Sequence, residues 1–495
     1  MGLSRQVAIV AVGRVATTAS IFVVNALLAR AWSLADFGRF SAIWILGNTL
    51  VPVFLLGIPT ALLYAFPRRQ TEVERRLLIR QASAILAGSA LVLMALLWLA
   101  GGPLSRWLSP AAATDLLIPF LPYVFSVVAA GHVEAALVAS GRSTWQAWLS
   151  VGGALGLVAA AGLAWQTGWS VADTLWALST VGAARCVVGW VLLALGPGGV
   201  GLPATTGVRS LLGYAGRIGL NDAVGSMSRA VDRVVVLTFL GTADLALYHV
   251  GAIEVPVSLM LAAVVTVLVP EVSRLSAAGK HDAVAQLFRG AVGRLSLFIL
   301  PLFCFLFVHA PTVIEVYLPA TYSRADEVFR IFLLALPLRC AVYNPVLVGM
   351  GRANWALYGS LGDLLLNAAL SVMLVQALLP AQAQWALLGP AAATMLATWC
   401  QVVVLVALVA RTLGQSWSQI LPWGRLGRVS VVSAAAALVS ATIVHFFQLP
   451  PILRLAVAVA VFAPLSMVAL RYWHRPDWDE LAGIGAAVNR RETSS

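Results

Sequence analysis

Charged side chains interrupt the long apolar runs of this sequence, and they are the groups with the most chemistry to offer. The basic ones are Arg14, Arg185, Arg217, Arg229, Arg233, Arg330 and Arg339, and the acidic ones are Glu134, Asp222, Asp232, Glu254 and Asp363. An ionisable group inside a bilayer costs several kcal/mol unless it faces a partner or a wet cavity. The excess of arginines predicts a net positive interior.

The segment 214–239 carries the densest set of these charges. A helical turn of about 100° per residue places four side chains on one stripe: Asp222, Ser226, Arg229 and Arg233. Arg229 and Arg233 are one turn apart, so their guanidiniums are expected to stack along one face. Asp232 lies beside the stripe and is expected to brace them, whereas Arg217 falls largely off it. Such a stripe must face a cavity or another helix.

Arginine suits an anionic ligand, because its planar fork binds phosphate through two hydrogen bonds and stays charged. The predicted cationic cavity is lined by Arg14, Arg217, Arg229, Arg233 and Arg339. The five carboxylates are predicted to brace charge or to couple transport to an ion: Glu134, Asp222, Asp232, Glu254 and Asp363. Two alternatives stay open, since an arginine can belong to a structural ion pair and a carboxylate can titrate with protons or bind sodium.

Composition identifies the elements that must position these residues. Of 495 residues, 60% are hydrophobic and 11% charged, with a mean hydropathy of +0.91. Soluble domains have about 25% charged residues, so the sequence predicts an all-α polytopic membrane protein. We expect about 14 transmembrane helices, at 8–31, 40–66, 82–101, 115–139, 146–165, 173–196, 214–239, 245–270, 295–318, 328–350, 356–380, 385–410, 429–448 and 452–471.

Several classes of protein are disfavoured by what the sequence lacks. The segments between the predicted helices are too short to hold a soluble catalytic domain. There is no GxxxxGK[ST] motif for a nucleotide, and the six histidines and four cysteines have no metal-ligand spacing. We therefore expect no enzyme activity, no metal, no cofactor and no nucleic-acid partner.

Basic residues indicate how the chain is oriented. With the N-terminus in the cytoplasm, about 20 of the 32 Lys and Arg residues fall in cytoplasmic segments and about five in outer ones. Cytoplasmic loops of membrane proteins are enriched in these residues. Both termini are thus predicted to be cytoplasmic.

A short stretch recurs in the chain, as "LVASGRSTWQAWLS" from Leu137 and "LVGMGRANWALYGS" from Leu347, about 210 positions apart. Trp107-Leu108 with Tyr317-Leu318, Arg80 with Arg289 and Phe37 with Tyr248 match at nearly the same spacing. We predict two six-helix bundles, 1–205 and 206–411, followed by two helices and a tail in 412–495. Since six is even, the bundles are parallel repeats around a central cavity. Each Gly-Arg is predicted to form the tight turn between the fourth and fifth helices.

Two stretches resemble the polysaccharide transport family of the multidrug/oligosaccharidyl-lipid/polysaccharide (MOP) exporter superfamily, the Wzx-type flippases. They are "LLARAWSLADFGRFSAIW" and "VDRVVVLTFLGTADLALYHVGA". The family pattern falls on Asp232-Arg233, Leu240-Gly241 and Leu245 to Tyr248. The resemblance covers nearly the whole chain, including the six-plus-six plan.

The resemblance implies a flippase that turns undecaprenyl-pyrophosphate-linked oligosaccharide across the bacterial inner membrane by alternating access. Its product feeds O-antigen, capsule or exopolysaccharide assembly, with a polymerase and a chain-length regulator as partners beside membrane lipids. Fourteen helices equal the number in lipid II flippases, so a peptidoglycan-precursor role stays open, as does a drug/cation antiporter of the MATE type. The last two helices are a candidate groove for the lipid tail.

Overall fold

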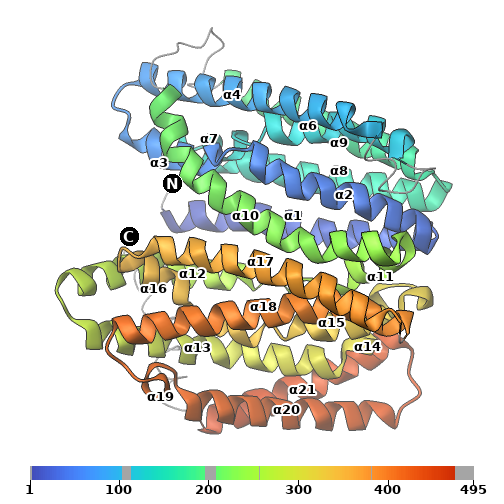
Figure 1. Cartoon of the computed structure of the whole chain (residues 1–495), viewed down its shortest axis with the longest axis vertical. Coiled ribbons are helices and arrows are strands. Elements are labelled where there is room, and N and C mark those ends of the chain that lie inside the picture. The colour runs from blue at the N-terminus through green and yellow to red at the C-terminus, as the bar shows by residue number, and fades with distance from the viewer. Residues whose placement is uncertain (1–2, 103–112, 196–207, 256, 381, 474–495) are drawn as a thin grey trace. The chain divides into compact units, whose positions relative to one another are not determined.

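A computed structural model of the chain describes residues 3–102, 113–195, 208–255, 257–380 and 382–473, and every regular element within these ranges is a helix (Figure 1). The predicted all-α class is confirmed. Twelve helical segments of the described chain are long and apolar enough to cross a membrane. The protein is therefore a multi-pass membrane protein.

Close contacts divide the chain into two compact units, Met1–Val250 with Leu364–Thr394, and Gly251–Asp363 with Met395–Ser495. The helices up to the first boundary are α1 (Leu3–Ala31), α2 (Leu34–Phe54), α3 (Ile58–Ala65), α4 (Glu72–Leu99), α6 (Ala113–Ala129), α7 (Val133–Ala139), α8 (Ser143–Thr167), α9 (Val171–Ala194), α10 (Val208–Leu240) and α11 (Thr242–Gly251). The later helices are α12 (Ser258–Ala277), α13 (His281–Val308), α14 (Ala310–Tyr317), α15 (Ala325–Leu333), α16 (Tyr343–Gly349), α17 (Ala353–Leu378), α18 (Ala383–Thr412), α19 (Trp417–Ile420), α20 (Trp423–His445) and α21 (Pro451–Trp473). Short 3-10 turns are η1 (Phe66–Arg68), η2 (Ala320–Tyr322) and η3 (Pro337–Cys340).

The predicted count of about fourteen spans is not confirmed. The two predicted spans without a counterpart among the twelve are 214–239 and 245–270. The first falls on α10, a helix of 33 residues whose charged side chains lower its hydropathy. The second is discontinuous, since α11 ends at Gly251 and α12 begins at Ser258. The division into 1–205, 206–411 and 412–495 stays a prediction.

A glycine pair sets the close approach of α10 to the break between α2 and α3. Gly57 has φ +69°, and a Cβ there would lie 2.4 Å from the carbonyl oxygen of Ala215. A Cβ on Gly219 would lie 2.6 Å from the carbonyl carbon of Leu56. Two backbones can come this close only where side chains are absent. The glycines therefore fix the depth at which α10 packs in the first unit.

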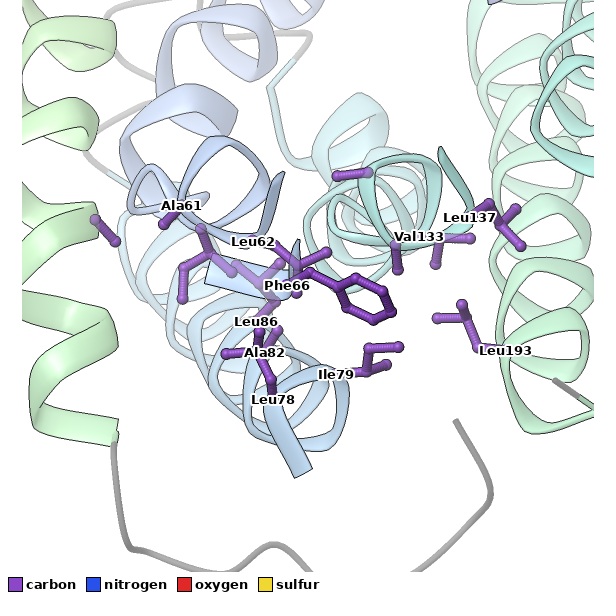
Figure 2. Packing of buried hydrophobic residues seen from close by; sticks show 14 of the residues in the cluster. Ala61, Leu62, Phe66, Leu78, Ile79, Ala82, Leu86, Val133, Leu137 and Leu193 are labelled. Carbon is purple, nitrogen blue, oxygen red and sulfur yellow. The ribbon is translucent and has the colours of Figure 1, made fainter. Parts of the chain in front are cut away.

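A cluster of buried apolar side chains joins α3, α4, α7 and α9 (Figure 2). Phe66 is 5% exposed and belongs to the same cluster as Leu86, Val133 and Leu137. Because lipid is as apolar as these side chains, close packing rather than exclusion of water stabilises such contacts. The cluster anchors the start of α7, one residue before Glu134.

Both Gly-Arg sequences form the predicted turn, one between α7 and α8 and the other between α16 and α17. Gly141 and Gly351 have φ of 75° and 73°. In each turn the arginine N–H donates to a carbonyl five residues back, at 2.8 Å from Arg142 to Leu137 and at 2.8 Å from Arg352 to Leu347. This is the bond that closes a helix through a left-handed glycine. Of the other aligned pairs, Trp107-Leu108 lies outside the described residues.

The arginine side chain of each turn also donates a hydrogen bond to the last turn of another helix. Arg142 Nη1 donates to the Leu192 carbonyl at 2.6 Å near the end of α9, and Arg352 Nη1 donates to Thr412 Oγ1 at 3.2 Å at the end of α18. The carbonyl groups in the last turn of a helix have no intrahelical partner, and the Leu192 carbonyl is one of them. The Thr412 hydroxyl lies beside such groups at the end of α18. This explains why the arginine recurs with the glycine.

Candidate functional site

The arginine stripe lies on α10. Arg229 is exposed, and Gly225, one turn earlier, leaves room for its guanidinium, since a Cβ there would lie 3.5 Å from Arg229 Nη1. Arg233 is half-buried, and its Nη1 donates to the carbonyl oxygen of Arg229. Asp222 is exposed on the same helix, and the side chain of Arg217 lies outside the described residues. No hydrogen bond or ion pair engages the Arg229 guanidinium within the described chain.

Asp232 faces away from the stripe and is only 1% exposed. Its carboxylate accepts hydrogen bonds from Tyr248 Oη at 2.8 Å, from the Arg233 N–H at 2.8 Å and from Thr394 Oγ1 at 3.3 Å. No guanidinium of the described residues lies within ion-pair distance of it. Asp232 is therefore held by hydroxyl and amide donors, and its bracing of the arginines stays a prediction.

A polar network extends from Asp232 to α17 and α18 within the first unit. Thr394 Oγ1 lies 3.1 Å from Asn367 Oδ1, which also accepts from Ser371 Oγ at 2.9 Å. Asn367 Nδ2 in turn reaches the Ser228 carbonyl at 3.4 Å. Asn367 and Ser371 are 1% and 0% exposed. Sequence reasoning missed them, although a polar pair four residues apart in an apolar helix was a usable signal.

Glu134 forms an ion pair with Arg185 of α9. Ser150 Oγ donates to the carboxylate at 2.9 Å and Gln146 Nε2 at 3.5 Å, both from α8. Helix α1 packs directly on this group, since a Cβ on its Gly13 would lie 3.2 Å from Ser150 Cβ. Of the two interpretations of Glu134, the geometry favours neutralisation of an arginine.

Arg14, the residue after Gly13, is exposed on α1. It makes no hydrogen bond or ion pair with any residue that the structure describes. Like Arg229, it carries an exposed guanidinium on a long helix. Both arginines belong to the first unit.

The second unit holds the remaining predicted residues. Arg339 of η3 lies 3.5 Å from Glu254, with both side chains at least half exposed. Asp363 of α17 accepts from Thr398 Oγ1 at 3.5 Å. An exposed ion pair contributes little, typically about 0–1 kcal/mol. These groups remain accessible, and the convergence of both sets of residues on one cavity stays a prediction.

No cluster of three or more His, Cys, Asp and Glu side chains suited to a metal ion occurs among the residues described. The charged groups of the site make hydrogen bonds and ion pairs, with exposed guanidiniums at Arg14 and Arg229 and a buried acceptor at Asp232. Together with the long apolar helices, they define a polytopic membrane protein with ionisable groups inside its helical bundle.

Comparison with solved structures identifies the fold as that of MOP-superfamily transporters. A lipid II flippase, MurJ, in an inward closed conformation matches with a TM-score of 0.67 at 12% identity, over 93% of this chain and 99% of that one. An inward-facing multidrug resistance MATE transporter matches with a TM-score of 0.67 at 13% identity, over 81% and 96%. A MOP superfamily transporter from Pyrococcus furiosus matches with a TM-score of 0.55 at 12% identity, over 83% and 96%.

The sequence assigns the family. A family model described as "Polysaccharide biosynthesis protein" matches residues 27–327, which is more than half of the chain. The chain belongs to this polysaccharide biosynthesis protein family, as the resemblance of its motifs indicated. No curated protein matches the chain in sequence.

Proposed function

We propose that this protein is a flippase that moves undecaprenyl-pyrophosphate-linked oligosaccharide across the bacterial inner membrane for surface polysaccharide assembly. The observation that carries the proposal is the exposed guanidinium of Arg229 on α10, which makes no hydrogen bond with a described residue and has the exposed Asp222 carboxylate as its electrostatic neighbour. A charge of this kind is tolerated in a membrane helix when it faces a wet cavity or a ligand. The family assignment makes a lipid-linked glycan the fitting ligand.

The pyrophosphate explains why arginines are needed. Its oxygens accept paired N–H donors from guanidiniums, which keep their charge at every accessible pH. Arg14, Arg217, Arg229, Arg233 and Arg339 are the proposed headgroup ligands. In alternating access the two bundles would expose these groups to one leaflet and then the other, while the lipid tail stays in the bilayer.

Asp232 is the proposed coupling group. A buried carboxylate that makes no close ion pair is costly unless hydrogen bonds, a proton or a cation compensate its charge. Because its oxygens contact hydroxyls and an amide N–H, occupation by a proton or by sodium would change the contacts among α10, α11 and α18. Glu254 and Asp363 are weaker candidates, since the former pairs with Arg339.

A lipid II-type precursor is the second candidate substrate. It is favoured by the match to nearly the full length of MurJ. It is also favoured by the two additional helices α20 and α21, which are the candidate groove for a lipid tail. Both candidates share the headgroup chemistry. The MATE-type alternative fits less well, because the first predicted helix carries Arg14 and no acid.

The transport test uses proteoliposomes that contain undecaprenyl-pyrophosphate-linked oligosaccharide and an impermeant glycosidase outside. Replacement of Arg229 by Gln removes charged donors and should slow the appearance of cleavable glycan by about tenfold or more. The matched control is Arg76→Gln, since Arg76 is also exposed but pairs with Glu72 at 3.8 Å on α4. Equal rates for both variants and the wild type would remove the case for the stripe. Faster flipping of lipid II than of the oligosaccharide would favour the second candidate.

Orientation and partners follow from the same proposal. Both termini would lie in the cytoplasm, and the glycan would be handed over on the outer face. A polysaccharide polymerase and a chain-length regulator are the partners expected there.

A further inference from the structure

A polar cavity lies in the second unit, at the ends of α13 and α20 and the beginnings of α14 and α21. Its volume is about 510 Å³, within the range of roughly 300–1,000 Å³ for small-molecule sites. The polar side chains in its wall are His309, Thr312, His445, Gln448 and Arg454. None of them belongs to the proposed transport site.

His309 offers this cavity an unused hydrogen-bond acceptor. The residue is 4% exposed, and its Nε2 lies 2.8 Å from Ser440 Oγ. Ser440 Oγ donates to the Ala437 carbonyl at 2.8 Å, so it must accept the proton of Nε2. Nδ1 is then an acceptor without a partner among the described residues. Burial lowers the pKa of His309, which follows the membrane span at Val308, and so favours the neutral ring.

The cavity is polar but not strongly cationic. Arg454 Nη2 donates to both carboxylate oxygens of Glu315, at 2.8 and 2.9 Å. The carboxylate neutralises the charge of the guanidinium. The other N–H groups of Arg454 can still donate hydrogen bonds, and the other lone pairs of Glu315 can still accept them. With His309 uncharged as well, an anion gains little from this site.

One wall of the cavity is apolar and accessible. Phe447 lines it with 54% of the residue exposed, and Gln448 beside it carries both a donor and an acceptor. A flat aromatic ring next to polar groups suits a ligand with one apolar face and a polar edge. Val308 and Val444 complete the wall.

We propose that this cavity binds a neutral saccharide ring. A pyranose presents hydroxyl donors to His309 Nδ1, hydroxyl acceptors to Arg454 and Gln448, and a C–H face to Phe447. This goes beyond the proposed transport function, because it assigns a separate saccharide site on the side that the predicted topology places outside. Such a site would hold the glycan after the headgroup has crossed.

The test measures dissociation constants by NMR titration of the full-length protein in nanodiscs. The probes are the methyl glycosides of glucose, galactose, N-acetylglucosamine and rhamnose. At least one should bind, and Phe447→Ala or Glu315→Gln should weaken it about tenfold. Phe446→Ala is the matched control, since Phe446 is 79% exposed and lies outside the cavity wall. It should bind like the wild type.

Three results would overturn the proposal. One is the absence of binding by all four glycosides. Another is equal loss in Phe446→Ala and Phe447→Ala, which would indicate contact with the exposed surface alone. The third is binding of inorganic phosphate that strengthens in Glu315→Gln, because freeing the Arg454 charge would then reveal an anion site.

Discussion

Asp232 and Arg233 are neighbours in the chain, yet α10 turns them toward different surroundings. The carboxylate is buried against Tyr248 and Thr394, whereas the arginine bonds along its own helix to Arg229. The Asp232 carboxylate thus bonds to the backbone of Arg233, while the Arg233 guanidinium bonds to the backbone of Arg229. At the scale of single residues, one helix therefore offers positive charge on one face and a protonatable group on another.

Replacement of Asp232 by Asn should uncouple transport. The amide keeps the size of the carboxylate but neither binds a cation nor changes its protonation. In proteoliposomes with an imposed proton or sodium gradient, the stimulation of flipping by the gradient should fall about tenfold. Asp115→Asn is the control, because Asp115 is exposed at the start of α6. Full stimulation of the Asp232 variant would exclude it as the coupling group.

The Glu134–Arg185 pair predicts a stability effect that depends on both partners. Glu134→Gln leaves the guanidinium unpaired and should lower the unfolding free energy by about 1–2 kcal/mol, discounted because both side chains are over a third exposed. The double variant with Arg185→Gln should recover part of that loss. Thermal unfolding of the four proteins of this cycle in detergent measures the coupling. A double variant no more stable than the single one would contradict the assignment.

Helix α10 is the element whose position matters most, and its glycines determine that position. Gly219 meets the backbone at Leu56 and Gly57, while Gly216 has open space around it. Two substitutions on one helix can thus be compared directly.

Gly219→Ala should destabilise the protein by about 1–3 kcal/mol, because the new methyl group must push two backbones apart. Gly216→Ala should leave stability unchanged or raise it by about 0.5–1 kcal/mol through the helix preference of alanine. The unfolding temperatures of both variants in one detergent check this. Equal effects would mean that the contact with the α2–α3 break does not position α10.

Sequence reasoning succeeded where local rules decide the outcome. The 3.6-residue period placed Arg229 and Arg233 on one face, and the left-handed glycines at Gly141 and Gly351 gave their turns. It failed for the Asp232 network, since Thr394 and Asn367 lie more than 130 residues away in sequence and only tertiary packing brings them close. The break after Gly251 was missed although Glu254 and Pro256 in the stretch "GAIEVPVS" were usable signals.

The whole molecule is expected to consist of parallel halves, and the positions after the two Gly-Arg turns test that directly. Thr144 and Asn354 are both exposed and stand about 210 residues apart. In a background with all four cysteines replaced, Thr144→Cys and Asn354→Cys should react with an impermeant maleimide only after the cells are opened. Thr167→Cys, at the other end of α8, should react in intact cells. Labelling of Thr144→Cys and Asn354→Cys from opposite sides would exclude parallel halves.

The two Gly-Arg turns share their backbone bonds and their arginine contact with a distant helix end, although the residues around them differ. A protein of half the length would have contained this turn and its arginine contact once. Duplication of its gene would have kept both features in each copy. The arginine of each turn already contacts a helix end, so substitutions elsewhere in either copy would leave that contact in place. Divergence of the two copies in function would then have had little effect on the stability of the turns.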